Sequence, residues 1–125
     1  MRMVRIVGIQ RSPDPYCEFV LLQNQGSLRL SLRGHALLRE DALESKDVDG
    51  LLHIFTDEVI IPPGVYILLH TGRGVPRWSR SRDGALVYVA FMERADSVWW
   101  GYHGPVHVLA PQHTYTERRE ALVAV

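Results

Sequence analysis

Short apolar or alternating runs recur along the chain, and each stops near glycine, proline, asparagine or aspartate. Runs of this kind are typical of β-strands joined by turns. Leu28, Leu30 and Leu32, for example, alternate with polar side chains, so they should point to one face of a half-buried strand. The pattern predicts strands over residues 3–9, 16–24, 28–32, 36–39, 51–55, 59–61, 65–70, 86–92, 98–102 and 106–109.

Together these runs predict an all-β protein in which two sheets pack around one core. The side chains that build such a core stand at alternate strand positions and face the opposite sheet. The predicted core includes Val20, Leu22, Leu28, Leu30, Leu32, Ile67 and Leu69.

Three segments depart from the strand pattern. Residues 40–50 contain five acidic residues and predict a solvated loop or one weak helical turn. Residues 71–84 contain three glycines and no hydrophobic period, which predicts a long loop. In the C-terminal tail, residues 111–125, Thr114 precedes Glu117 at the spacing of a helix capping box, but β-branched residues follow. The tail therefore predicts either a helix or a terminal strand.

Length, composition and charge fit one globular domain over residues 1–125. Hydrophobic residues make up 46% of the chain and charged residues 22%, which is close to the average for globular proteins. The 14 acidic residues balance the 14 lysines and arginines, so no overall positive charge favours nucleic acid. A local basic patch remains compatible with this balance.

The cysteine content and the N-terminal residues bear on the compartment. Cys17 is the only cysteine, so no disulfide can form within the chain, and we expect it to be a small buried hydrophobic residue. The N-terminal residues lack the apolar segment of a signal peptide. No apolar run approaches the roughly 20 residues that cross a bilayer. These features predict a cytoplasmic protein with no membrane partner.

Four segments, in this order, carry a resemblance to a known family: residues 18–24 (EFVLLQN), 30–37 (LSLRGHAL), 60–66 (IIPPGVY) and 83–89 (DGALVYV). They resemble the landmarks of the lamin-tail domain family, and the resemblance runs from about Val4 to Val108. It implies an immunoglobulin-like β-sandwich. It also implies an interaction or accessory module, because the family brings no catalytic residues with it.

Residues that could support catalysis lack suitable spacing. Gly72 and Gly74 open a dinucleotide-binding glycine motif, but the third glycine and the crossover helix are missing. His103 and His107 are four residues apart, yet the Gly-Pro between them prevents the helix that would put both rings on one face. We therefore predict no catalytic residue, cofactor or metal. The alternative is an enzyme with a dispersed site that uses His35, His53, His70 or His113, or a Cys17 nucleophile with a remote histidine.

The candidate contact surface lies in the long loop at residues 73–82, which holds four arginines and one tryptophan. Guanidinium groups suit phosphates and carboxylates, and an indole can stack on a base or a peptide. Three interpretations stay open, namely a solvated loop, a protein partner and a nucleic acid. Basic loop and acidic loop could also meet between two copies. The residues concerned are Arg73, Arg77, Trp78, Arg80 and Arg82.

Two predicted strands carry apolar residues on both faces. Phe19 and Leu21 alternate with predicted core residues, and Trp99 is adjacent to Trp100. We expect Phe19, Leu21 and Trp99 to lie outside the core and to need a cover. Leu122 and Val123 of the tail supply little apolar area, which favours a second copy or a partner protein. The sequence thus predicts a non-catalytic interaction module that binds a protein partner or self-associates, with nucleic-acid binding as the weaker alternative.

Overall fold

The computed structural model describes residues 3–117. Ten strands account for its regular structure, and the only helices in these residues are two short 3₁₀ segments, η1 (Glu40–Glu44) and η2 (Asp49–Leu51). The all-β prediction is therefore confirmed. The strands are β1 (Val4–Gln10), β2 (Phe19–Asn24), β3 (Leu30–Ser31), β4 (Ala36–Arg39), β5 (Leu52–Ile54), β6 (Ile60–Ile61), β7 (Tyr66–His70), β8 (Arg77–Arg80), β9 (Leu86–Phe91) and β10 (Val106–Leu109).

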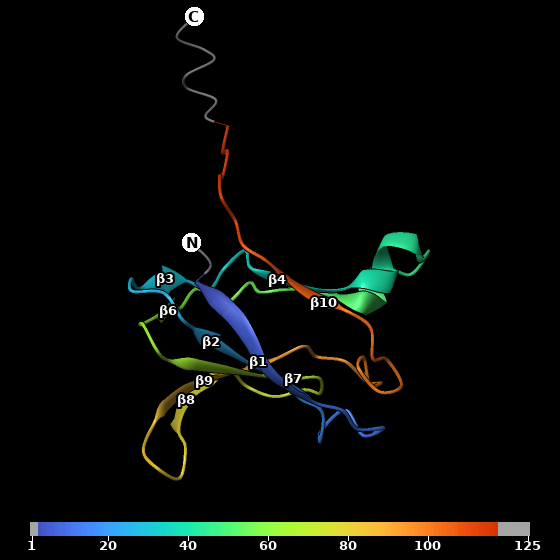
Figure 1. Cartoon of the computed structure of the whole chain (residues 1–125), viewed down its shortest axis with the longest axis horizontal. Helices are drawn as coiled ribbons and strands as arrows, with labels where there is room; N and C mark the ends of the chain where they lie inside the picture. Colours follow the sequence, from blue (N-terminus) through green and yellow to red (C-terminus); the bar gives the residue numbers. More distant parts are fainter. Residues whose placement is uncertain (1–2, 118–125) are drawn as a thin grey trace, which may run out of the picture.

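The strands form two layers (Figure 1). A five-stranded sheet in the order β1-β2-β7-β9-β8 makes one layer. A three-stranded sheet, β10-β4-β5, and a two-stranded sheet, β3-β6, face it across the core. All pairs in the large sheet are antiparallel except β7 and β9, which run parallel because the chain crosses over through β8 between them.

The core lies between the layers and takes one residue in two from β2 and β7. Six of the seven predicted core residues are buried: Val20, Leu22, Leu30, Leu32, Ile67 and Leu69. The prediction for Leu28 was wrong, because its side chain is 68% exposed. The buried Asn24 side chain accepts a hydrogen bond from Gly26 N and donates one to the Leu28 carbonyl, which holds a turn here. Leu28 therefore precedes β3 and does not share its inward face.

Residues 98–102 do not form the predicted strand, and Trp99 does not lie outside the core. Tyr102 N donates a hydrogen bond to the Trp99 carbonyl, and Gly101 has a φ of 80°, so the backbone turns here. The N–H groups of Val98 and Trp99 bind the Glu18 carboxyl group instead of a neighbouring strand. The turn directs Trp99 into the core, where it is 1% exposed, and leaves Trp100 56% exposed.

The prediction of one long loop over residues 71–84 was wrong in its second half, because β8 (Arg77–Arg80) lies within it. A turn around Gly84, with a φ of 87°, joins β8 to β9, and Ser81 N donates a hydrogen bond to the Ala85 carbonyl. β8 is exposed on most of its surface, so it lacks the apolar alternation of a half-buried strand. Pairing with β9, and not side-chain burial, makes this segment a strand.

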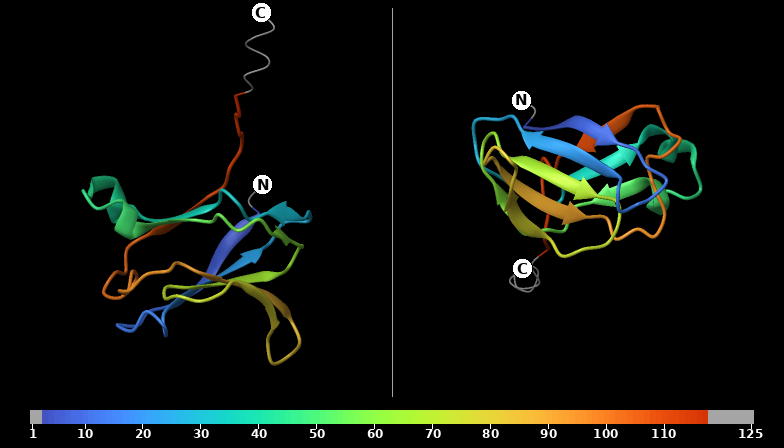
Figure 2. Two further views of the ribbon diagram at one scale, coloured as in Figure 1. Left: turned by 180° about the vertical axis from the view of Figure 1, so that it is seen from behind. Right: turned by 90° about the horizontal axis from the view of Figure 1, so that it is seen from below.

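Residues 111–117 leave the three-stranded layer and point away from the five-stranded sheet (Figures 1 and 2). Residues 111–117 form neither a helix nor a strand. The rest of the predicted tail element, including Leu122 and Val123, lies outside the described residues. Within residues 3–117 no helix has the length and apolar character needed to cross a membrane.

Candidate functional site

The outer face of the five-stranded sheet carries three cross-strand rows of side chains. The central row joins Leu21 of β2, Leu68 of β7 and Val89 of β9, and ends at Arg77 of β8. Alternate residues of a strand share one face, so the residues two positions away on each strand form the flanking rows on the same face. One flanking row contains Phe19, His70 and Phe91, and the other contains Gln23, Tyr66, Val87 and Ser79.

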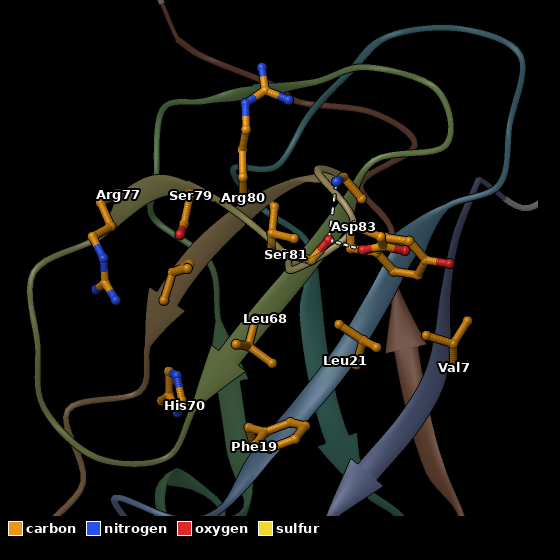
Figure 3. Close-up of a pocket in the computed structure, with 14 residues that line it drawn as sticks. Val7, Phe19, Leu21, Leu68, His70, Arg77, Ser79, Arg80, Ser81 and Asp83 are labelled. Carbon is orange, nitrogen blue, oxygen red and sulfur yellow. Dashed lines mark hydrogen bonds between the residues drawn. The ribbon is translucent and has the colours of Figure 1, made fainter.

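These rows form the floor of an open groove of about 730 Å³, which we call the outer-face groove (Figure 3). Ser81, Asp83 and Ala85 of the β8–β9 turn line one wall, and Val7 lies on the opposite side. Val7 belongs to a β-bulge in β1, where the register shifts between Ile6 and Gly8. The right-hand view of Figure 2 faces this sheet, and no other described segment crosses its central strands.

Aromatic rings close one end of the groove. The His70 ring stacks on Phe91 with centroids 5.3 Å apart and meets Phe19 edge-on at 6.0 Å. The Arg77 guanidinium lies 6.0 Å from the centre of the Phe91 ring. A Cβ atom at Gly74 would stand 2.3 Å from the Phe91 ring, so any other residue here would require the ring to shift. The glycine that suggested a nucleotide motif therefore has a packing role here.

The rim of the groove is positively charged. Arg77 and Arg80 line it together with His70 of the aromatic end. Burial, and to a smaller extent the charge of Arg77, lowers the pKa of His70, so the ring is neutral near pH 7. Asp83 is the acidic residue of the lining, and its carboxylate already accepts a hydrogen bond from Ser81. The groove thus combines an apolar floor with two guanidinium groups that form no ion pair with another described residue.

The structure brings together four of the eight residues predicted to contact a partner. Phe19, Leu21, Arg77 and Arg80 all line the outer-face groove. Arg73 and Arg82 lie in the loops on either side of β8, outside the lining.

The two tryptophans have other positions. Trp78 points to the other face of β8 and meets the Tyr88 ring edge-on, with centroids 5.2 Å apart. Trp99 is a core residue and takes no part in a surface.

The histidines are dispersed over the molecule. His35 contacts the Leu32 carbonyl, His107 contacts Glu40 at 3.1 Å, and His70 lies in the groove. His53 of β5 packs edge-on against Phe55. Within residues 3–117 no three histidine, cysteine, aspartate or glutamate side chains come together in a way that could hold a metal ion.

Burial of His53 predicts a pH-dependent stability. Burial lowers the pKa of His53 to about 4; Arg94 adds to this effect and Asp57 opposes it. Because the folded pKa lies below the unfolded value of 6.5, the stabilisation is present above pH 6.5 and is lost as the pH falls toward 4. We expect a loss of about 2 to 3 kcal/mol from this residue in urea unfolding.

The variant His53→Leu should flatten the dependence of stability on pH, because leucine does not titrate. The buried Nε2 of His53 has no hydrogen-bond partner among the described residues, so the substitution removes no hydrogen bond of this atom. The pKa of His35 and that of His70 are lowered too, so part of the slope should remain. His107→Gln, at an exposed position, is the matched control. An unchanged slope in His53→Leu would contradict the assignment.

Cys17 is exposed and lies in the turn before β2, so the prediction that it is buried was wrong. Its Sγ donates a hydrogen bond to the Asp14 carboxylate. This hydrogen bond and the negative charge of Asp14 raise the pKa of the thiol. A nucleophilic cysteine needs the opposite shift, so the surroundings of Cys17 disfavour a thiolate.

Sequence reasoning missed the groove residues of β7 and β9. Leu68, Val87 and Phe91 share its floor or its aromatic end, but the sequence analysis did not separate the two faces of the apolar runs that contain them. The usable signal was present in Tyr66–His70 and Leu86–Phe91, which are apolar at both odd and even positions, like Phe19–Asn24. Three adjacent strands with this property indicate an apolar outer face.

No protein-family model matches the chain, and no curated protein does. The resemblance to the lamin-tail domain family therefore depends on the four ordered segments and on the roles of their residues. Several of those residues are structural in this chain. Glu18 and Asn24 are buried and hydrogen-bonded, and Gly34, Gly64 and Gly84 adopt positive φ in turns.

Proposed function

We propose that this chain is a non-catalytic interaction module of the lamin-tail type, with an immunoglobulin-like sandwich that binds a protein surface in its outer-face groove. The observation that carries the proposal is the apolar floor of that groove. Leu21 and Leu68, with Phe19 and Val87 beside them, occupy positions that polar residues hold on a sheet that faces water. A cytoplasmic location belongs to the same proposal, supported by a single cysteine without a disulfide.

Covering the floor would stabilise a complex through the hydrophobic effect. Full burial of a large apolar side chain contributes roughly 1.5 to 3 kcal/mol. Phe19, Leu21, Leu68 and Val87 are partly buried already, so each contributes only a fraction of this amount when it is covered. The described part of the tail leaves on the opposite side of the molecule, which favours a second chain as the cover. The occupant is a partner protein or a second copy of this chain.

Site-specific photo-crosslinking tests the proposal. A photoreactive amino acid at Leu68, at the centre of the groove, should give one dominant adduct in the cells that make the protein. The same group at Leu109, which is 49% exposed on the other layer, is the matched control. Mass spectrometry separates an adduct of two copies from an adduct with another protein. Equal adduct patterns from the two positions would contradict the proposal.

A charge placed on the groove floor should weaken the complex identified in this way. Leu21→Lys puts an ammonium group among apolar side chains, and its desolvation opposes docking. We expect the dissociation constant of the purified complex, measured by sedimentation or calorimetry, to rise roughly tenfold or more. Leu109→Lys should leave it unchanged, and a loss of affinity in both variants would argue against the groove.

Nucleic-acid binding remains the second candidate function. It is favoured by four arginines within residues 73–82, none of which forms an ion pair with another described residue. Binding to generic single-stranded DNA that falls steeply with salt would support it, because neutralising phosphates releases counterions.

A further inference from the structure

β8 is a free edge of the large sheet. It pairs with β9 on one side, and among the described residues no backbone hydrogen bond joins it to any other segment. Its outward N–H and C=O groups are therefore available to another strand. Figure 1 shows the β8–β9 hairpin projecting from the large sheet. Arg77, Ser79 and Arg80 of β8 line the outer-face groove, so this edge lies along the groove wall.

The side chains of β8 follow a defined order. Arg77 and Ser79 face the groove, and Trp78 faces the other side. Arg80 alternates with Ser79 at the end of the strand, where it borders the groove at its rim. Trp78 meets the Tyr88 ring with one edge and remains 41% exposed. Arg80 donates a hydrogen bond to the Gly84 carbonyl, which orients its guanidinium without neutralising it. The edge therefore has a positive residue at each end and two less polar positions between them.

We propose that an extended segment of a partner protein pairs with β8 as a sixth strand and carries the pattern acidic, apolar, apolar, acidic. This inference rests on the proposed function, because the added strand is the part of the protein partner that enters the groove. The two carboxylates pair with Arg77 and Arg80. One central side chain lies over the groove beside Ser79, and the other packs on the exposed surface of Trp78.

The chemistry of this edge disfavours two other occupants. A second copy that paired through its own β8 would bring arginines close to arginines, and like charges on neighbouring strands are destabilising. A nucleic-acid backbone offers phosphate acceptors to the arginines. It has no regular donors, however, for the outward carbonyl groups of a strand edge. A polypeptide strand supplies both donors and acceptors, as in strand addition to other sheet edges.

Amide chemical shifts in an NMR titration test the inference with a short synthetic probe, Thr-Ser-Glu-Val-Val-Glu-Ser-Thr. We expect shifts that saturate and that centre on the amides of Arg77–Arg80. The same peptide with lysines in place of its glutamates should bind roughly tenfold or more weakly. N-methylation of both valines removes an N–H that faces β8, whichever register is used, and should abolish binding.

Charge-matched protein variants locate the site. Arg77→Glu combined with Arg80→Glu should weaken binding of the probe at least about tenfold. Arg5→Glu combined with Arg29→Glu changes the net charge equally at exposed positions away from β8, and binding should persist.

Three results would overturn the inference: no shifts at millimolar peptide, equal binding of the N-methylated peptide, or equal shifts from an oligothymidylate of the same charge. The crosslinking at Leu68 is an independent measurement. If the adduct forms there and the probe does not pair with β8, the interaction module stands and only the added strand fails.

Discussion

Replacing Glu18 with alanine should lower the free energy of unfolding by about 4 to 6 kcal/mol, the largest effect expected from a single polar residue in this chain. The Glu18 side chain is fully buried. Its Oε1 accepts hydrogen bonds from Thr71 Oγ1 at 2.8 Å, Val98 N at 2.8 Å and Trp99 N at 3.1 Å. Its Oε2 accepts one from Ser12 N at 3.3 Å.

This network joins three connections at one end of the sandwich-like layers. Ser12 lies between β1 and β2, Thr71 follows β7, and Val98 and Trp99 lie between β9 and β10. Alanine would leave buried donors without an acceptor, and each such donor costs about 1 to 3 kcal/mol. Because Phe19 follows Glu18 directly, loosening this network would also disturb the aromatic end of the groove.

Two further variants separate the hydrogen bonds from simple loss of volume. Glu18→Gln keeps one oxygen acceptor but turns an NH₂ group toward another donor, so we expect a smaller loss of about 1 to 3 kcal/mol. Glu58→Ala removes an exposed partner of Arg33 and should change stability by less than about 1 kcal/mol. Urea unfolding gives the three values, and a Glu18→Gln loss as large as that of Glu18→Ala would contradict the acceptor role.

Much of the strand structure was predictable from the sequence, because most strands bury one face. β4 and β10 begin and end at the residues that the hydrophobic pattern predicted, Ala36–Arg39 and Val106–Leu109. Proline and glycine marked the turn around Gly64 correctly, since this glycine has positive φ. Local alternation and local turn chemistry suffice for such elements.

Alternation and turn residues could not predict β8. Its residues, Arg77–Arg80, are polar or exposed on both faces, and pairing with β9 is a nonlocal property. The parallel pairing of β7 with β9 depends on the same crossover. The sequence of residues 73–82 consequently predicted a loop, although the 4 residues of β8 within it form the edge on which Arg77 and Arg80 are placed.

The hydrogen bonds of Glu18 could not be predicted from the sequence either. Its partners Thr71 and Val98 are 53 and 80 residues away in sequence, and three of its donors are backbone groups that carry no sequence signal. The outward direction of Phe19 and Leu21 was predictable because β2 is apolar at consecutive positions. Which rows they join across β7 and β9 required the register.

Replacing Trp99 with alanine should destabilise the fold by about 3 to 5 kcal/mol, whereas Trp100→Ala should change stability by less than about 0.5 kcal/mol. The two adjacent indoles differ only in where the turn at Gly101 directs them, so they form a matched pair. Far-UV circular dichroism during urea unfolding is the suitable signal, since the substitutions remove tryptophan fluorescence. Similar losses in the two variants would contradict the core position of Trp99.

Trp99→Phe changes both the packing of the ring and the indole N–H. The buried Nε1 of Trp99 has no hydrogen-bond partner among the described residues, so phenylalanine removes an unsatisfied donor as well as part of the ring volume. The two effects oppose each other, and we expect a net loss of about 1 to 2 kcal/mol, well below that of alanine. Because Trp99 lies inside the fold, folded Trp99→Phe should bind a groove partner with unchanged affinity. Leu21→Lys should lose that affinity while staying folded, and this contrast separates the core from the contact surface.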